Sequence, residues 1–184
     1  MTQRSKQTGK FLLLIFSIAF ANVGASAQSD YPNKVIENGK LKWEDFSGPV
    51  DPTSKHAAVT YWLVNYKYKI LSYRGDTAHV DLQVSTFLKG NSWVLPDQKT
   101  DRLLEHEQGH FNVALICALR FKKAIASTVI LKSNHAEKIN SIFKALISEA
   151  NQMDLQYDEE TRHSLDKVAQ MKWNLKLNAL LLNP

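Results

Sequence analysis

The stretch LLEHEQGHFNVALICALRF, residues 103–121, decides the fold because it joins a pair of histidines to a long apolar run. Residues four apart lie on one face of an α-helix, so a helix here places His106 and His110 side by side. Two neutral imidazoles in that position can hold one Zn²⁺ ion, and Glu107 is close enough to accept a proton from its water. The pattern H-E-x-x-H therefore predicts a metal site on a helix.

The apolar run around this motif indicates a buried helix. Nearly every residue from Phe111 to Leu119 is apolar on all sides, which is typical of a helix that crosses the middle of a domain. The alternative is that the two histidines are hydrogen-bonded core residues and Glu107 a solvated acid. Gly109 indicates that another group approaches this helix closely, either a substrate or a packed neighbour.

The N-terminus has the pattern of a secretory signal peptide. Three basic residues precede an apolar run over residues 11–21, and Ala25-Ser26-Ala27 matches an A-x-A cleavage site. We therefore expect a signal peptide over residues 1–27 and a single mature domain over residues 28–184. The apolar run is too short for a comfortable permanent anchor, so we expect a periplasmic or secreted protein without a stable membrane span. An uncleaved anchor is the alternative.

The charge and the single cysteine argue against nucleic-acid binding and against an internal disulfide. The leader contains three of the basic residues and no acid, so its removal lowers the formal net charge of +5 to +2. No basic stripe with interleaved aromatic residues occurs in the mature part, and we expect no nucleic-acid partner. The only cysteine, Cys117, cannot form an internal disulfide, and we interpret it as a packing thiol.

The first half of the mature chain predicts strands. A short strand is expected over residues 41–46, burying Trp43 and Phe46. Apolar and polar residues alternate over residues 60–70 and again over residues 80–88, with Arg74-Gly75-Asp76 between them, which predicts a hairpin. We interpret the Arg-Gly-Asp triplet as the bend of this hairpin rather than as an adhesion motif. A last short strand is expected over residues 92–95.

The second half predicts three helices. Their expected ranges are about 97–131, 136–157 and 160–182, each with apolar residues at helical spacing. The sequence therefore predicts an α+β fold, in which a small antiparallel sheet is followed by three helices in a zincin-like arrangement. We expect a monomer.

A hydrolytic zinc ion keeps three protein ligands and one open position, so a third ligand must come from elsewhere. The continuation H-x-x-G-x-x-H of the metzincins is excluded because Val113 and Ile116 occupy the required positions. The segment over residues 157–163 contains the candidates. His163 is the first choice, followed by Glu160 and Asp158, since imidazole and carboxylate are both zinc ligands. The alternative is that Asp158 merely caps a helix with an acidic first turn.

Four short motifs resemble the bacterial domain of unknown function 922. They are H-E-Q-G-H-F at residues 106–111, Y-D-x-x-T-x-H at 157–163, S-W-V at 92–94 and W-x-D-F at 43–46. The resemblance covers nearly the whole mature chain. It implies a secreted zinc-dependent protease, with His106, Glu107, His110 and His163 at the matching site positions. Ser164 departs from the glycine expected after the last histidine.

These observations lead to the hypothesis of a secreted zinc metallopeptidase that acts on peptides or proteins. His106, His110 and His163 would bind Zn²⁺, and Glu107 would be the general base. Tyr157 or Arg162 would donate a hydrogen bond to the tetrahedral intermediate. The hairpin and the strand over residues 92–95 could offer an edge on which an extended peptide adds.

Two other hypotheses remain open. One is a non-catalytic periplasmic binding protein stabilised by zinc, which a fourth coordinating side chain would favour. The other is a di-iron carboxylate oxidase, because Glu107 and Glu160 each begin an E-x-x-H motif. The oxidase would need two further glutamates, for which Glu149 is the one plausible interior candidate.

Overall fold

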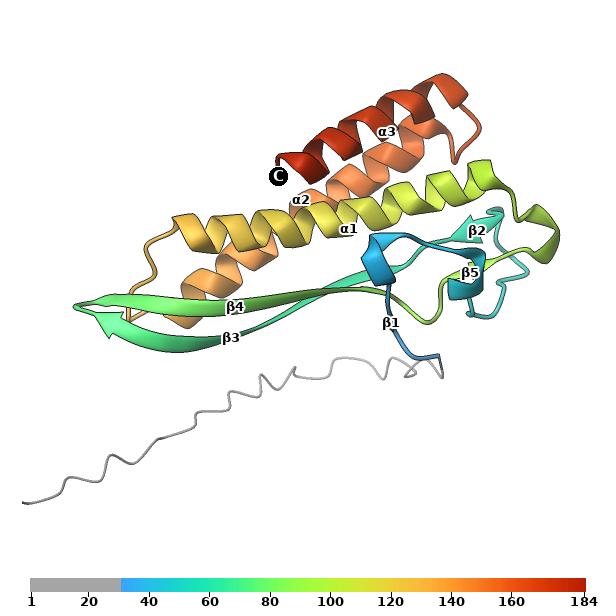
Figure 1. Cartoon of the computed structure of the whole chain (residues 1–184). Helices are drawn as coiled ribbons and strands as arrows, with labels where there is room; N and C mark the ends of the chain where they lie inside the picture. Colours follow the sequence, from blue (N-terminus) through green and yellow to red (C-terminus); the bar gives the residue numbers. More distant parts are fainter. Residues whose placement is uncertain (1–30) are drawn as a thin grey trace, which may run out of the picture.

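One long hairpin and three helices make up most of residues 31–184, the part of the chain that this computed structural model describes (Figure 1). The order is β1 (Lys34–Val35), β2 (Ala58–Val59), β3 (Trp62–Arg74), β4 (Thr77–Leu88), β5 (Trp93–Val94), α1 (Asp101–Ser127), α2 (His135–Thr161) and α3 (Lys167–Leu182). Three short 3₁₀ turns lie at Glu37–Gly39, Trp43–Asp45 and Pro96–Gln98. The predicted α+β class, with a small antiparallel sheet before three helices, is confirmed. The predicted leader lies outside the described residues.

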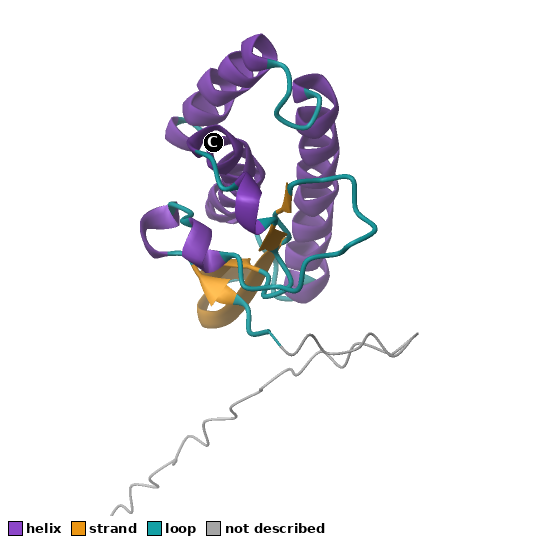
Figure 2. Ribbon diagram, turned by 90° about the vertical axis from the view of Figure 1, so that its right-hand side faces the viewer, coloured by secondary structure: helices purple, strands orange, loops and turns teal. Residues whose placement is uncertain are grey.

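The predicted hairpin is present and longer than expected. β3 and β4 pair antiparallel from Trp62↔Leu88 to Arg74↔Thr77, with an irregularity between Ile70 and Ser72. Gly75 forms the bend with a φ of 59°, a conformation that glycine adopts without steric penalty. The interpretation of Arg-Gly-Asp as a turn is therefore confirmed. β1 extends this sheet beside β4, and β2 and β5 form a separate pair at the end of the molecule where α1 begins (Figures 1 and 2).

The strand predicted over residues 41–46 is wrong. Trp43–Asp45 is a 3₁₀ turn, because the Asp45 carboxylate accepts a hydrogen bond from the Lys42 backbone N–H and closes the chain locally. Leu41 and Phe46 on either side are nevertheless buried, so the segment contributes to the core without joining a sheet.

The helix boundaries differ from the predicted ones for identifiable reasons. α1 begins at Asp101 because the Thr100 hydroxyl accepts a hydrogen bond from Leu103 N. It ends at Ser127 because the following residues pair with the start of β4, where Ala78 N donates to Ile130 O. α2 continues through Thr161, and α3 begins only after Asp166, whose carboxylate caps it. Asp158 therefore lies inside α2, and the interpretation of Asp158 as a helix cap is wrong.

The core forms around α1, which contacts α2, α3, β2 and both long strands. One part of it joins Phe121 and Ile125 to the inward face of the hairpin and to Ile139 of α2. Another joins Val113, Ile116 and Cys117 to Trp173 and Leu177 of α3. Within residues 31–184, no helix has the length and apolar character needed to cross a bilayer.

The packing of Cys117 predicts an unreactive thiol. Burial raises the pKa of Cys117 to about 11, so the reactive thiolate is scarce near neutral pH. We expect iodoacetamide at pH 8 to leave the native protein unmodified and to modify one thiol per chain in guanidinium chloride, as measured by mass spectrometry. Rapid alkylation of the folded protein at pH 8 would contradict the packing described here.

Candidate metal centre

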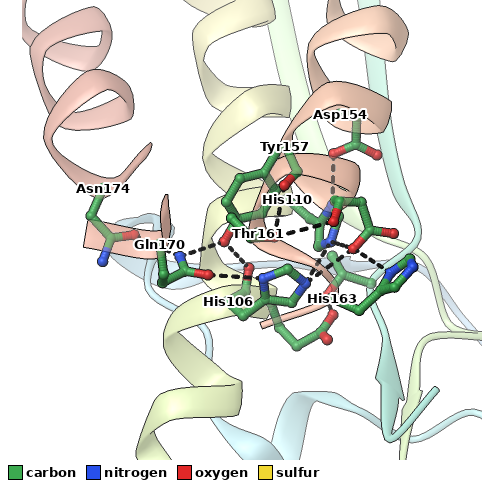
Figure 3. A network of polar contacts seen from close by, with 11 residues as sticks. His106, His110, Asp154, Tyr157, Thr161, His163, Gln170 and Asn174 are labelled. Atoms are coloured by element: carbon green, nitrogen blue, oxygen red, sulfur yellow. Dashed lines mark hydrogen bonds and ion pairs between the residues drawn. The ribbon is translucent and has the colours of Figure 1, made fainter. Parts of the chain in front are cut away.

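Two histidines of α1 form the centre of the site. His106 and His110 are one helical turn apart, and their Nε2 atoms face each other at 3.3 Å (Figure 3). His106 is 3% exposed, and the side chain of His110 is 12% exposed. The sequence prediction that these two imidazoles lie on one face of a buried helix is confirmed.

The other nitrogen of each imidazole is held by a different helix. The side-chain amide of Gln170, on α3, donates two hydrogen bonds of 2.8 Å each, one to Tyr157 Oη and one to Asn174 Oδ1. Gln170 Oε1 is thus left to accept a hydrogen bond from His106 Nδ1 at 3.0 Å. Asp154 of α2 accepts from His110 Nδ1 at 2.8 Å. These bonds leave the two Nε2 atoms as the ones available to a metal ion.

Asp158 of α2 is the third donor. Its Oδ1 atom lies 3.3 Å from His106 Nε2 and 3.6 Å from His110 Nε2. His106, His110 and Asp158 are the one group of potential metal ligands found among residues 31–184. Ligands about 2.0–2.1 Å from a tetrahedral metal ion are separated from one another by roughly 3.3 Å. The three observed separations agree with that spacing, so the donor set fits a small divalent cation.

The charge around the three donors also favours a cation. Burial lowers the pKa of His110, but hydrogen bonds to Asp154 and Asp158 outweigh it and raise that pKa to about 10. Burial acts against ionisation of Asp158, and hydrogen bonds from His106 and His110 nevertheless hold its pKa well below the usual range. The two carboxylates thus stabilise a positive charge at this place, which is the His110 proton in the metal-free site and which a bound cation would displace.

Glu107 lies beside this group and is held by a strand connection. It is 2% exposed, and its Oε2 atom accepts a hydrogen bond of 2.6 Å from the hydroxyl of Thr60, which lies between β2 and β3. Glu107 and the three donors line one cleft of about 1000 Å³, together with Asp154 and residues of the segment 54–61. The cleft therefore presents a buried carboxylate next to the candidate metal position.

Tyr157 occupies a different place from the one expected of a catalytic donor. It is fully buried, and its hydroxyl donates to His106 O at 2.8 Å. Its ring stacks on His106 at a centroid distance of 4.9 Å. Tyr157 does not line the cleft, and its hydroxyl hydrogen is already bonded to His106 O. In this structure Tyr157 therefore supports His106.

Gly109 explains how Tyr157 can come so close. A Cβ atom at Gly109 would overlap the hydroxyl and ring carbons of Tyr157. The close approach that the sequence indicated is therefore made by a packed side chain of α2.

His163 lies at the edge of the site, bonded to the third donor. Its Nδ1 atom is 2.8 Å from Asp158 Oδ1, and its side chain is 55% exposed. The predicted coordination by His163 stays a prediction, since the converging donor set contains Asp158 instead. Arg162, His163 and Ser164 all have positive φ, and Ser164 has 72°, which explains why a glycine suits that position.

Glu160 and Glu149 do not support a di-iron site. Glu160 is exposed and accepts a 2.7 Å hydrogen bond from Trp173 Nε1 of α3. The Glu149 side chain is 60% exposed and faces Arg120. Neither acid belongs to the group of potential ligands, so neither supplies one of the carboxylates that the di-iron hypothesis needs.

Sequence reasoning missed three residues of the site. Asp154 is one helical turn before Asp158, and that spacing could have identified it. Gln170 and Thr60 carry no such signal, because each comes from a different element and is brought to the site only by packing.

Comparison with known proteins identifies one family. The model of a family described as "Bacterial protein of unknown function (DUF922)" matches residues 43–164, about two thirds of the chain. The matched segment contains Thr60, the H-E-x-x-H motif and Asp158, and it ends before α3. No curated protein and no solved structure matches the chain.

The contact between Gly109 and Tyr157 generates a prediction. Gly109→Ala should destabilise the protein by about 1–3 kcal/mol through overpacking, although alanine favours a helix by about 1 kcal/mol. Denaturant unfolding would measure the change, with Lys122→Ala as an exposed control on the same helix. In a Tyr157→Leu background, Gly109→Ala should be far less harmful, because the ring is gone. An equal loss in both backgrounds would refute the contact.

Proposed function

This chain belongs to the DUF922 family of bacterial proteins of unknown function, and on that premise we propose that it is a secreted zinc-dependent peptidase. The proposal is carried by one observation: three nitrogen and oxygen donors converge at tetrahedral spacing in a cleft beside a buried glutamate. The predicted leader, residues 1–27, supports export, and the resemblance of the motifs supports the reaction class.

Zinc is the metal that we propose. Two imidazoles and one carboxylate form a ligand set that hydrolytic zinc enzymes use, and they leave a fourth position open. His106, His110 and Asp158 would hold the ion, while Gln170 and Asp154 fix the two imidazole rings. Bound zinc would supply Lewis acidity and lower the pKa of a coordinated water to about 7.

Glu107 would move the proton. Its Oε2 atom is held by the Thr60 hydroxyl, so the carboxylate is fixed in the cleft with Oε1 left to accept a proton from the attacking water. The same carboxyl group then delivers that proton to the amine that leaves when the peptide bond breaks. His163 and Ser164 line the cleft beside the donors, where they can contact substrate.

The shape of the cleft supports an extended peptide as substrate. Its volume of about 1000 Å³ is at the upper end of the range for ligand pockets. Both residues of β2 line it, and β5 is the one strand of the described chain that pairs with β2. A peptide could therefore add along β2 through backbone hydrogen bonds, which would give little sequence selectivity.

Substitution of the general base tests the reaction. Glu107→Gln should bind zinc like the parent protein but hydrolyse peptides about 10²–10⁴-fold more slowly, because the amide cannot accept the proton. Zinc content would be measured by mass spectrometry, and hydrolysis by the cleavage of a proteome-derived peptide library. Glu105→Gln, an exposed acid on the same helix, is the matched control and should retain full activity. Parent-level hydrolysis by Glu107→Gln would refute the mechanism.

The partner of His106 provides a test that does not require activity. Gln170→Leu removes the acceptor that orients His106 and should weaken zinc binding by about 10–100-fold. Competition with a chromophoric chelator would measure the affinity. Gln156→Leu, an exposed glutamine on α2, is the control and should leave it unchanged. An unaltered affinity in Gln170→Leu would contradict the orienting role assigned to Gln170.

A further inference from the structure

The outer face of α3 and the loop before it expose a row of large apolar side chains. Leu165, Val168, Met171, Leu175 and Leu182 are between 60% and 80% exposed. Trp173 and Leu177, on the opposite face of the helix, are buried against α1 and the rest of the core. α3 is therefore apolar on two faces, and it lies on the side of the molecule away from the hairpin (Figure 1).

The exposed row is a narrow stripe bordered by lysines. With a rotation of about 100° per residue, the four exposed side chains of α3 fall within about 60° around the helix axis. Lys172 and Lys176 border one side of this stripe, and Lys167 borders the other. α3 contains no aspartate or glutamate between Lys167 and Leu182. Lys176 lies over the Trp173 ring, and its charge helps to lower the pKa of Glu160 on α2.

We propose that this stripe docks the protein onto the surface of an anionic lipid bilayer. An apolar face with flanking lysines is the pattern of a helix that lies in the interface plane, with the leucines immersed and the ammonium groups among the headgroups. Docking through this stripe depends neither on zinc nor on Glu107.

The composition of the stripe favours lipid over a protein partner. Protein interfaces are enriched in tryptophan, tyrosine and arginine and depleted in lysine. The stripe has none of the three enriched residues, since Trp173 is turned inward. Lysines are the only charged residues within α3 itself, and Asp166, which caps the helix, lies between Leu165 and Lys167. A second copy packed on the stripe would bring the lysines of two helices together, and neither helix has an acid between Lys167 and Leu182. Anionic headgroups complement those lysines instead.

The stripe also begins at the cleft. Leu165 is the first residue of the row and lines the cleft next to His163 and Ser164. A protein docked through α3 would therefore hold one rim of its cleft close to the lipid surface. Chains that emerge from a membrane would then reach the cleft most readily.

A site-specific probe tests the docking. Leu175→Cys would be labelled with the environment-sensitive fluorophore NBD, which the buried Cys117 thiol should not take up. We expect brighter, blue-shifted emission when vesicles of phosphatidylglycerol and phosphatidylcholine are added, and a much smaller change with phosphatidylcholine alone. Val35→Cys, which is 72% exposed on β1, is the control and should report no insertion. Because the probe reports its own position, insertion of the N-terminal segment would not mimic this result.

Substitution of the lysines and measurement of the oligomeric state complete the test. Lys167→Gln and Lys172→Gln should each weaken vesicle binding by about fivefold, while Lys122→Gln on α1 should not. No response at residue 175, or an equal response at residue 35, would overturn the inference. So would a dimer in solution, measured by light scattering, that Leu175→Lys converts to a monomer. Glu107→Gln should bind vesicles like the parent, which separates this proposal from the peptidase proposal.

Discussion

The close approach of α2 to α1 at Gly109 is the constraint on which the site depends. Only a residue without a side chain leaves room for the Tyr157 ring, and the ring in turn reaches His106 O with its hydroxyl. Asp158 is the next residue of α2, so the same contact sets its carboxylate opposite the two imidazoles. A small shift between the helices would separate donors that now lie 3.3–3.6 Å apart.

The polar groups of the site form a connected network inside an apolar shell. Gln170 connects His106 to Tyr157 and Asn174, while Asp154 holds His110 from the other side. Buried polar groups that lack partners are costly, and here each of these groups has one. The network fixes which nitrogen of each imidazole points into the cleft. Through Gln170 the network also includes α3, which lies beyond the segment matched by the family model.

The three helices have different roles in this arrangement. α1 carries the histidines and Glu107 through the middle of the core, and α2 presents Asp154, Tyr157, Asp158 and Thr161 on one face. α3 supports His106 with its inner side and exposes an apolar stripe on its outer side. The hairpin packs along α1: much of it contacts Phe121 and Ile125, while Val64 and Leu88 lie in the parts of the core that contain Val113 and Phe111. Thr60, which precedes β3, is the link between the strands and the site.

The sequence by itself determined the elements and half of the site. Alternation over residues 60–88 predicted the hairpin, and helical spacing predicted three helices, because both patterns depend on local geometry. The pair His106 and His110, with Glu107 between them, follows from the same periodicity. The tertiary structure decided the rest. Asp158, rather than His163, belongs to the group of converging donors because α2 continues past Tyr157. Gln170 and Thr60 reach the site through packing between elements far apart in sequence. Contacts of that kind depend on how helices approach one another, and no spacing within a single segment encodes the approach.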